Sequence, residues 1–218
     1  MAWALIDTDV LLKITSYKLL KLLLETEPFG SKDFGMIAAA QFVVASKFKK
    51  KLEGHQLEEV KIHFLEAITS IAAIEPNPEE LELAAQLESA AIAFGVDLDL
   101  GESQLCALML AREIELMMTG DKRAIKAIAA LREHEACEHI HGKVASLEQL
   151  VLWMIEKSGL ESVQPSICAL PKTIDISLTM ALGCYSGGSP LESCQDGLVS
   201  YIHSSQADAP GVLVAYPI

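Results

Sequence analysis

Residues 4–12 read ALIDTDVLL. Asp7 and Asp9 interrupt an apolar run that is typical of a buried strand leading into a helix. An ionised carboxylate without a partner in a protein core carries a large desolvation cost. We therefore expect Asp7, which lies within the strand run itself, to hold a cation or a polar partner.

Apolar strand segments alternate with helical segments along the chain after this stretch. The alternation predicts an α/β domain with a largely parallel sheet over residues 1–158. Residues 159–218 are richer in Gly, Ser, Pro and Cys and are interpreted as a helical appendage with helices near 174–184 and 191–205. The expected strands are 2–7, 34–39, 114–119 and 140–145, and the expected helices are 10–24, 40–52, 56–74, 78–94, 102–113, 121–133 and 146–157.

Composition limits the class of protein. The 218 residues are 51% hydrophobic and carry a net charge of −13, which argues against nucleic-acid binding over the whole surface. We expect no signal peptide, because Asp7 and Asp9 break the first apolar stretch, and no membrane span. The five cysteines form no C-x-x-C pair, so we expect reduced thiols in a cytoplasmic protein; the alternative is a disulfide among Cys168, Cys184 and Cys194.

Acidic residues fall where strands end and helices begin. Asp7 ends the first strand, Asp121 follows the strand 114–119, and Glu102 opens a helix just after Asp99. Ligands of open parallel sheets bind beyond the carboxyl ends of the strands, where these positions would meet. Carboxylates brought together need cations, and oxygen-only ligands favour Mg²⁺ or Mn²⁺.

Helix capping is the competing explanation for most of these acids. Asp9 fits the N-cap of the first helix, Asp121 fits the cap of the helix that follows it, and Asp99 with Glu102 has the D-x-x-E spacing of a capping box. Asp7 is the exception, because it lies inside the strand run. One buried acid together with three acids at strand-to-helix junctions favours a metal site.

Three segments carry a resemblance to a known family. ALIDTDVLLKI, LDLGESQLCALMLA and LMMTGDKRAI are similar, in their order and spacing, to the motifs of the PIN-domain nucleases. The resemblance covers about residues 1–158. It implies a three-layer α/β/α fold and a metal-dependent phosphodiesterase, an endoribonuclease acting on single-stranded RNA or, less often, a nuclease acting on single-stranded or flap DNA.

The resemblance also implies roles for individual residues. Asp7 would be the central ligand of a Mg²⁺ or Mn²⁺ ion, and Glu102 and Asp121 would complete a catalytic acidic cluster that activates water against the scissile phosphate. The hydroxyls of Thr8 and Thr119 would orient ligands or substrate. Asp9 and Asp99 would be auxiliary acids near the metal.

The chain departs from the family in one element. The helix 40–52 lacks the acid that PIN domains usually carry there, and its available polar residues are Gln41 and Ser46. The departure weakens one metal site and the expected turnover. Lys122 and Arg123, next to Asp121, are candidates for binding substrate phosphates, with ordinary surface charge as the alternative. The same two explanations apply to the basic cluster of the chain, Lys47, Lys49, Lys50 and Lys51.

The sequence is also compatible with two other functions. A non-catalytic PIN-like module that binds RNA or a partner fits the missing helix acid and the negative charge. DTDVLL also resembles the opening motif of haloacid-dehalogenase-type phosphatases, with Asp7 as nucleophile and Asp9 as general acid. Leu11 departs from that motif, and the second acid expected after Gly120–Asp121 is absent. An antitoxin-like protein inhibitor or a second copy of the chain are further candidate partners, and residues 159–218 are candidates for a dimer interface, a lid or a partner dock.

One histidine-rich segment raises the question of zinc. His134, Cys137, His139 and His141 lie close together, but their spacing matches no common zinc site. We interpret these residues as surface positions at the start of a strand. Lys13, Lys18 and Lys21 are likewise expected on the solvent side of the first helix.

Overall fold

The computed structural model describes residues 3–26, 33–133 and 139–215. Their strands form one five-stranded parallel sheet in the order β3-β2-β1-β4-β5. The central strand, β1, is completely buried because it has a neighbour on each side and helices above and below. The α/β class with a parallel sheet is confirmed. The strands are β1 (Ala4–Ile6), β2 (Phe34–Ile37), β3 (Ile71–Ile74), β4 (Leu116–Thr119) and β5 (Val144–Ser146).

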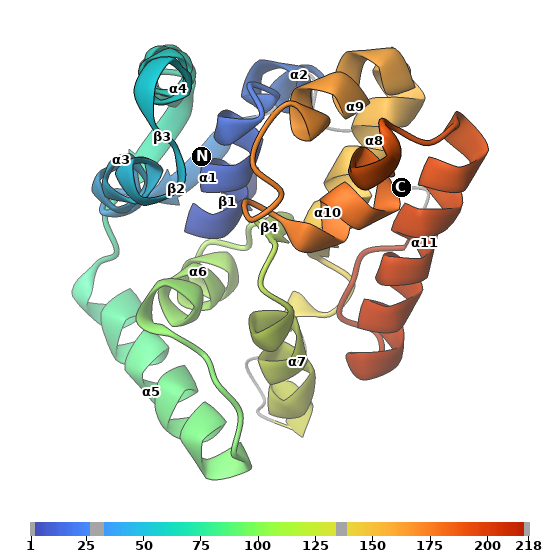
Figure 1. Ribbon diagram of the computed structural model, residues 1–218. Helices are drawn as coiled ribbons and strands as arrows, with labels where there is room; N and C mark the ends of the chain where they lie inside the picture. The colour runs from blue at the N-terminus through green and yellow to red at the C-terminus, as the bar shows by residue number, and fades with distance from the viewer. Residues whose placement is uncertain (1–2, 27–32, 134–138, 216–218) are drawn as a thin grey trace.

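Helices cover both faces of the sheet, as expected for a three-layer α/β/α arrangement (Figure 1). Helices α1, α3 and α4 contact one another, and α5, α6 and α7 form a second group. Helices α8 to α11 pack together beside them. The bounds are α1 (Thr8–Ser16), α2 (Leu20–Glu25), α3 (Ala40–Lys51), α4 (Gly54–Ile68), α5 (Pro78–Phe94), α6 (Leu100–Ala111), α7 (Lys122–Ala130), α8 (Leu147–Ser158), α9 (Leu160–Cys168), α10 (Ile176–Ala181) and α11 (Leu191–Asp208).

The helix expected over 56–74 is wrong in its last turn. α4 ends at Ile68, and Ile71–Ile74 form the edge strand β3, which pairs with β2. The spacing of Ile68 and Ile71 continues the helical pattern, so periodicity alone does not mark this boundary. Pairing with β2 decides the conformation of this short segment, in which the end residues Ile71 and Ile74 are buried and the two alanines between them are exposed.

Two further boundaries differ from the expectation. The helix expected over 10–24 is two helices, because Lys18 has a φ of 59° that ends α1 before α2 begins at Leu20. The strand expected over 140–145 covers only Val144–Ser146, so His139 and His141 lie in a turn before it. His134 and Cys137 lie outside the described residues.

The cap signals around α5 are confirmed. Asn77 and Glu80 form a capping box, Pro78 occupies the first turn, and Gly95 ends the helix with a φ of 70°. These residues fit because the amide and carboxylate accept the unpaired N–H groups of the first turn, and glycine tolerates a left-handed backbone.

The C-terminal segment corrects the expectation for cysteine. Cys168 at the end of α9 and Cys184 form a disulfide, so the expectation of reduced thiols throughout is wrong, whereas Cys106 and Cys194 are buried and take no part in this disulfide. Leu213 forms a parallel bridge with Val144, which attaches the end of the chain to β5. Helix α9 was not expected. No helix in the described part of the chain has the length and apolar character needed to cross a membrane.

Candidate functional site

Asp7 lies at the carboxyl end of the central strand. It occupies the N-cap position of α1, so the expectation that Asp9 is the cap is wrong. The Asp7 side chain makes no capping hydrogen bond. The side chain is only 6% exposed, and its Oδ2 accepts a hydrogen bond from the Thr119 hydroxyl at 3.0 Å. The same hydroxyl oxygen accepts the backbone N–H of Asp121 at 3.2 Å. Thr119 therefore connects the ends of β1 and β4 through one side chain.

Glu102 and Asp99 form the capping box at the start of α6. The Asp99 carboxylate accepts the N–H of Glu102, and the Glu102 carboxylate accepts the N–H of Asp99, both at 2.9 Å. The capping explanation is thus confirmed for this pair. It does not use Glu102 completely, because only Oε2 of this buried carboxylate takes part in the capping box. The capping box therefore orients the carboxylate and leaves an oxygen for another ligand.

Asp121 caps α7 and also holds an arginine. Its Oδ1 accepts the backbone N–H of Arg123 at 2.8 Å, as expected for an N-cap. The Arg123 guanidinium contacts both carboxylate oxygens, at 3.2 Å and 2.6 Å. A cation is therefore already present on Asp121, supplied by the protein itself.

The pKa values show that these acids from three elements influence one another. Burial, together with the nearby Asp9 and Asp99, raises the pKa of Asp7 to about 6 against the opposing hydrogen bond from Thr119. Burial, together with the carboxylates of Asp99, Asp121 and Asp7, raises the pKa of Glu102 to about 7. Burial alone would raise the pKa of Asp121, yet the Arg123 guanidinium holds it below its usual value.

These donors fit a hard divalent cation. Carboxylate oxygens are the ligands that Mg²⁺ and Mn²⁺ prefer, and two of the three acids are destabilised as anions without a positive charge nearby. Across residues 3–26, 33–133 and 139–215, no group of three or more His, Cys, Asp or Glu side chains stands arranged to hold a metal. One reason is visible in the contacts of Asp121, whose oxygens face Arg123 instead of the other acids.

Asp9 forms an ion pair with a lysine of its own helix. Its carboxylate pairs with Lys13 at 2.6 Å, and Lys13 also pairs with Asp175 at 2.8 Å. The Lys13 side chain is 12% exposed, so its expected place on the solvent side of α1 is wrong. A side-chain carbon at Gly120 would lie 2.5 Å from Asp9 Oδ2, so the Asp9 carboxylate closely approaches the residue after β4. Asp175 is the N-cap of α10, so the half-buried Lys13 connects α1 to the C-terminal segment.

Of the other residues expected at the site, some lie beside Asp7 and others make contacts elsewhere. Lys122 pairs with the buried Glu148 at 3.2 Å and lies 4.7 Å from the ring centre of Tyr201, so it faces the C-terminal segment. Thr8 begins α1, and its backbone N–H lowers the pKa of Asp7. The alternative positions on α3 supply no acid: Gln41 is half-buried, and the Ser46 hydroxyl donates to the Val43 carbonyl of its own helix.

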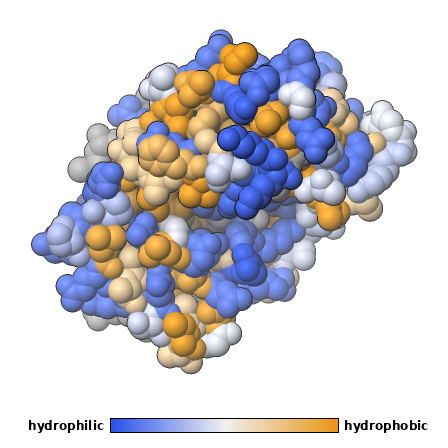
Figure 2. Space-filling view, turned by 60° about the vertical axis from the view of Figure 1, so that its left-hand side comes forward, coloured by the Kyte–Doolittle hydropathy of each residue, from blue (hydrophilic) through white to orange (hydrophobic). Residues whose placement is uncertain are grey.

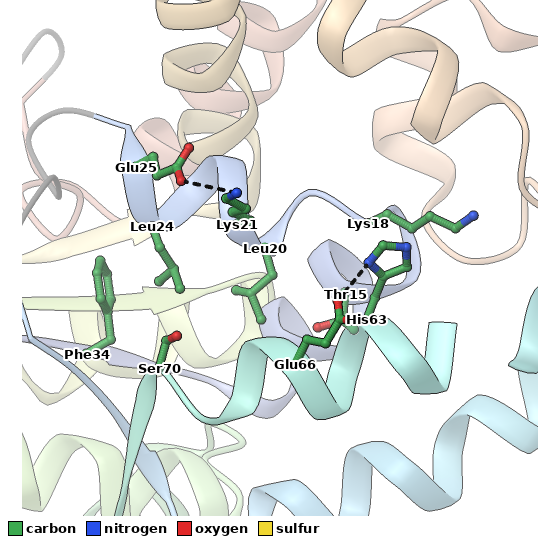
Figure 3. A pocket seen from close by; sticks show the side chains of 10 residues that line it. All are labelled: Thr15, Lys18, Leu20, Lys21, Leu24, Glu25, Phe34, His63, Glu66 and Ser70. Carbon is green, nitrogen blue, oxygen red and sulfur yellow. Dashed lines mark ion pairs between the residues drawn. The ribbon is translucent and has the colours of Figure 1, made fainter. Parts of the chain in front are cut away.

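A pocket of about 540 Å³ lies at the opposite edge of the sheet (Figure 3). Phe34, the first residue of β2, and Ser70, which precedes β3, mark it as the amino edge. Leu20, Leu24 and Phe34 form its apolar wall. None of the acids described above lines this pocket, so it does not belong to the candidate site.

Sequence reasoning missed Lys13, Asp175 and Glu148. Lys13 follows Asp9 by four residues, the spacing of a helical ion pair, and this signal was available. Asp175 and Glu148 are distant in sequence from their lysine partners, and no local pattern connects them.

Comparisons of the chain with models of protein families, with curated proteins and with solved structures found no match in any of the three.

Proposed function

We propose that this chain is a metal-dependent ribonuclease that hydrolyses phosphodiester bonds of single-stranded RNA at the carboxyl edge of its sheet. One observation carries the proposal: burial raises the pKa of Glu102, and carboxylates from the ends of β1 and β4 and from the loop before α6 act in the same direction. Such an arrangement is unfavourable without a cation and favourable with one. The resemblance of the DTD, GES and TGD segments to PIN-domain nucleases supports the same class of chemistry.

Each residue of the site would have a specific role in this reaction. Asp7, Glu102 and Asp121 would hold Mg²⁺ or Mn²⁺, and the capping box and Thr119 would orient Glu102 and Asp7. The cation would polarise the scissile phosphate and promote attack by water. Release of Asp121 to the metal would free the Arg123 guanidinium to bind a phosphate oxygen.

Specific contacts bear on the two alternative functions. The absence of an acid at Gln41 and Ser46, and the occupation of Asp121 by Arg123, favour a non-catalytic PIN-like module. The phosphatase mechanism needs Asp9 as a general acid next to the nucleophile, whereas Asp9 is neutralised by Lys13. This contact argues against the phosphatase.

The proposal is tested by incubating the protein with a labelled single-stranded RNA and, separately, with a small phosphomonoester. We expect slow RNA cleavage that needs Mn²⁺ and stops when EDTA removes the metal. Cleavage of the phosphomonoester alone, with a beryllofluoride adduct on Asp7, would identify a phosphatase. Intact folding with no activity on either substrate and no bound Mn²⁺ would identify the non-catalytic module.

Replacing Arg123 with alanine is expected to strengthen Mn²⁺ binding by up to about fivefold, because an exposed ion pair contributes at most about 1 kcal/mol. The guanidinium is exposed and competes with the metal for Asp121, while the capping bond uses the backbone N–H and survives the change. Isothermal titration measures the affinity. Lys126→Ala, on the same helix as Arg123, removes a pair with Asp208 of α11; it is the control and should leave the affinity unchanged. Equal affinities for wild type and Arg123→Ala would show that no competition exists.

A further inference from the structure

The pocket at the amino edge of the sheet is lined by a buried hydroxyl group without a partner. Thr15, in the last turn of α1, lines this pocket and is only 1% exposed, and its hydroxyl makes no hydrogen bond within the described part of the chain. Two other buried hydroxyls nearby in the sequence do make one. Ser16 donates to the Leu12 carbonyl and Thr26 donates to the Leu22 carbonyl, both at 2.7 Å. A buried polar group without a partner is unfavourable, and a ligand in the pocket would supply the missing partner.

The same pocket has an apolar wall. Leu20 and Phe34 are each 3% exposed, and Leu24 packs against the core. In Figure 3, Phe34 and Leu24 lie on the left, and Thr15 and Glu66 lie to their right. The volume of about 540 Å³ is within the range of about 300–1,000 Å³ that is typical of small-molecule sites. On the side of the molecule that carries α3 to α5, hydrophobic residues lie in separate groups among hydrophilic ones (Figure 2). The pocket therefore suits an apolar ligand body better than that surface does.

The two lysines that line the pocket each have a carboxylate nearby. Lys18 pairs with Glu59 at 2.5 Å, and Lys21 lies 3.9 Å from Glu25. The Lys21 side chain is 87% exposed, so water screens its charge. These lysines therefore offer an anionic ligand little unpaired positive charge.

Glu66 lies beside an imidazole and not beside a lysine. The Nδ1 atom of His63 is 3.9 Å from the Glu66 carboxylate, and this contact is an ion pair only when the imidazole is protonated. With a neutral imidazole, the charged residues that line the pocket, together with Glu59, carry one more negative than positive charge. The net charge of −13 adds a long-range attraction for cations. A positively charged ligand is therefore favoured over an anion.

We infer that this pocket binds a small organic cation that consists of a primary ammonium group on an apolar body. An ammonium group donates up to three hydrogen bonds, which the Glu66 carboxylate and the Thr15 hydroxyl oxygen would accept. The apolar body would lie against Leu20, Leu24 and Phe34. The inference does not depend on the proposed function, because the pocket and the candidate site lie at opposite edges of the sheet.

Three probes with the same apolar body test the charge of the ligand: 2-phenylethylammonium, 2-phenylethanol and 3-phenylpropanoate. NMR titration of the full chain with each probe at pH 8 measures the Kd. We expect a Kd of about 1 mM for the ammonium, which has few atoms. The alcohol and the carboxylate should bind at least about fivefold more weakly, because they lose the ion pair with Glu66. Equal binding of the three probes, tighter binding of the carboxylate, or no saturable binding of the ammonium would overturn the inference.

Glu66→Gln is expected to weaken binding of 2-phenylethylammonium by about fivefold and to leave the affinity for 2-phenylethanol unchanged. Glu58→Gln is the matched control, because Glu58 lies on the same helix and is 68% exposed against 70% for Glu66. Glu58 pairs with Lys61 and does not line the pocket, so its replacement should leave both affinities unchanged. An unchanged affinity of Glu66→Gln for the ammonium would contradict the assignment of the cation site.

Thr15→Val replaces the unpaired hydroxyl with a methyl group and separates a ligand contact from a packing role. We expect the Tm of the ligand-free protein to rise by about 2 °C, because a buried polar group without a partner is removed. The affinity for 2-phenylethylammonium should fall by about fivefold. Thr26→Val, which removes the hydrogen bond to the Leu22 carbonyl, should lower the Tm and leave the affinity unchanged. A Thr15→Val protein with a lower Tm and the wild-type affinity would show that the hydroxyl serves packing only, and would overturn the inference.

Discussion

Glu102→Gln is expected to lower Mn²⁺-dependent cleavage of single-stranded RNA by at least about 100-fold, while the protein stays folded. Glutamine at this position still accepts the backbone N–H of Asp99, so the capping box and α6 are preserved. The change removes one negative charge from a buried group of acids, and a metal contributes several kcal/mol to catalysis of this kind. Single-turnover cleavage and circular dichroism measure the two effects.

Glu80→Gln is the matched control for this variant. Glu80 occupies the equivalent position of the capping box at the start of α5, is equally buried, and pairs with Arg112 instead of with the candidate site. It is expected to lower thermal stability, because it loses that ion pair, and to retain cleavage. If Glu102→Gln cleaves RNA at the wild-type rate, or if both variants lose activity equally, Glu102 has no role as a metal ligand.

Asp7→Asn is expected to raise the stability of the metal-free protein at pH 8 by about 3 kcal/mol. The pKa of Asp7 is about 6 in the folded protein against 3.8 ordinarily, and this difference corresponds to about 3 kcal/mol. Because the folded state binds the proton more tightly, the stabilising effect is complete below pH 3.8 and is lost as pH rises through 6. Asparagine does not ionise, and its carbonyl oxygen still accepts the Thr119 hydroxyl. Chemical denaturation in EDTA at pH 4 and pH 8 measures the difference, which should be small at pH 4.

The same variant removes the response to metal. Mn²⁺ should stabilise the wild type strongly at pH 8, where Asp7 is ionised, and stabilise Asp7→Asn much less. Asp33→Asn, which removes an exposed carboxylate before β2, serves as the control and should behave as wild type. An equal increase in Tm on addition of Mn²⁺ to Asp7→Asn and wild type would exclude Asp7 as a ligand.

Elements with local signals could be predicted from the residues alone. The alternation of apolar strands and helices predicted the α/β class, and Asn77, Pro78 and Gly95 predicted the ends of α5. Asp7 within an apolar run identified the buried acid at the central strand, because a carboxylate in such a place is unfavourable without a partner. The spacing of Asp99 and Glu102 identified their capping box.

Contacts between distant segments depend on how the folded chain packs. Pairing with β2 made residues 71–74 a strand, although their apolar spacing also fits the preceding helix. The disulfide of Cys168 with Cys184 was one of several pairings that the cysteine count allows. Lys13 is held between an acid four residues away and Asp175, which approaches only when α10 packs beside α1. Such partners are chosen by the packing of the folded chain, because a charge removed from water needs whichever opposite charge the fold brings near it.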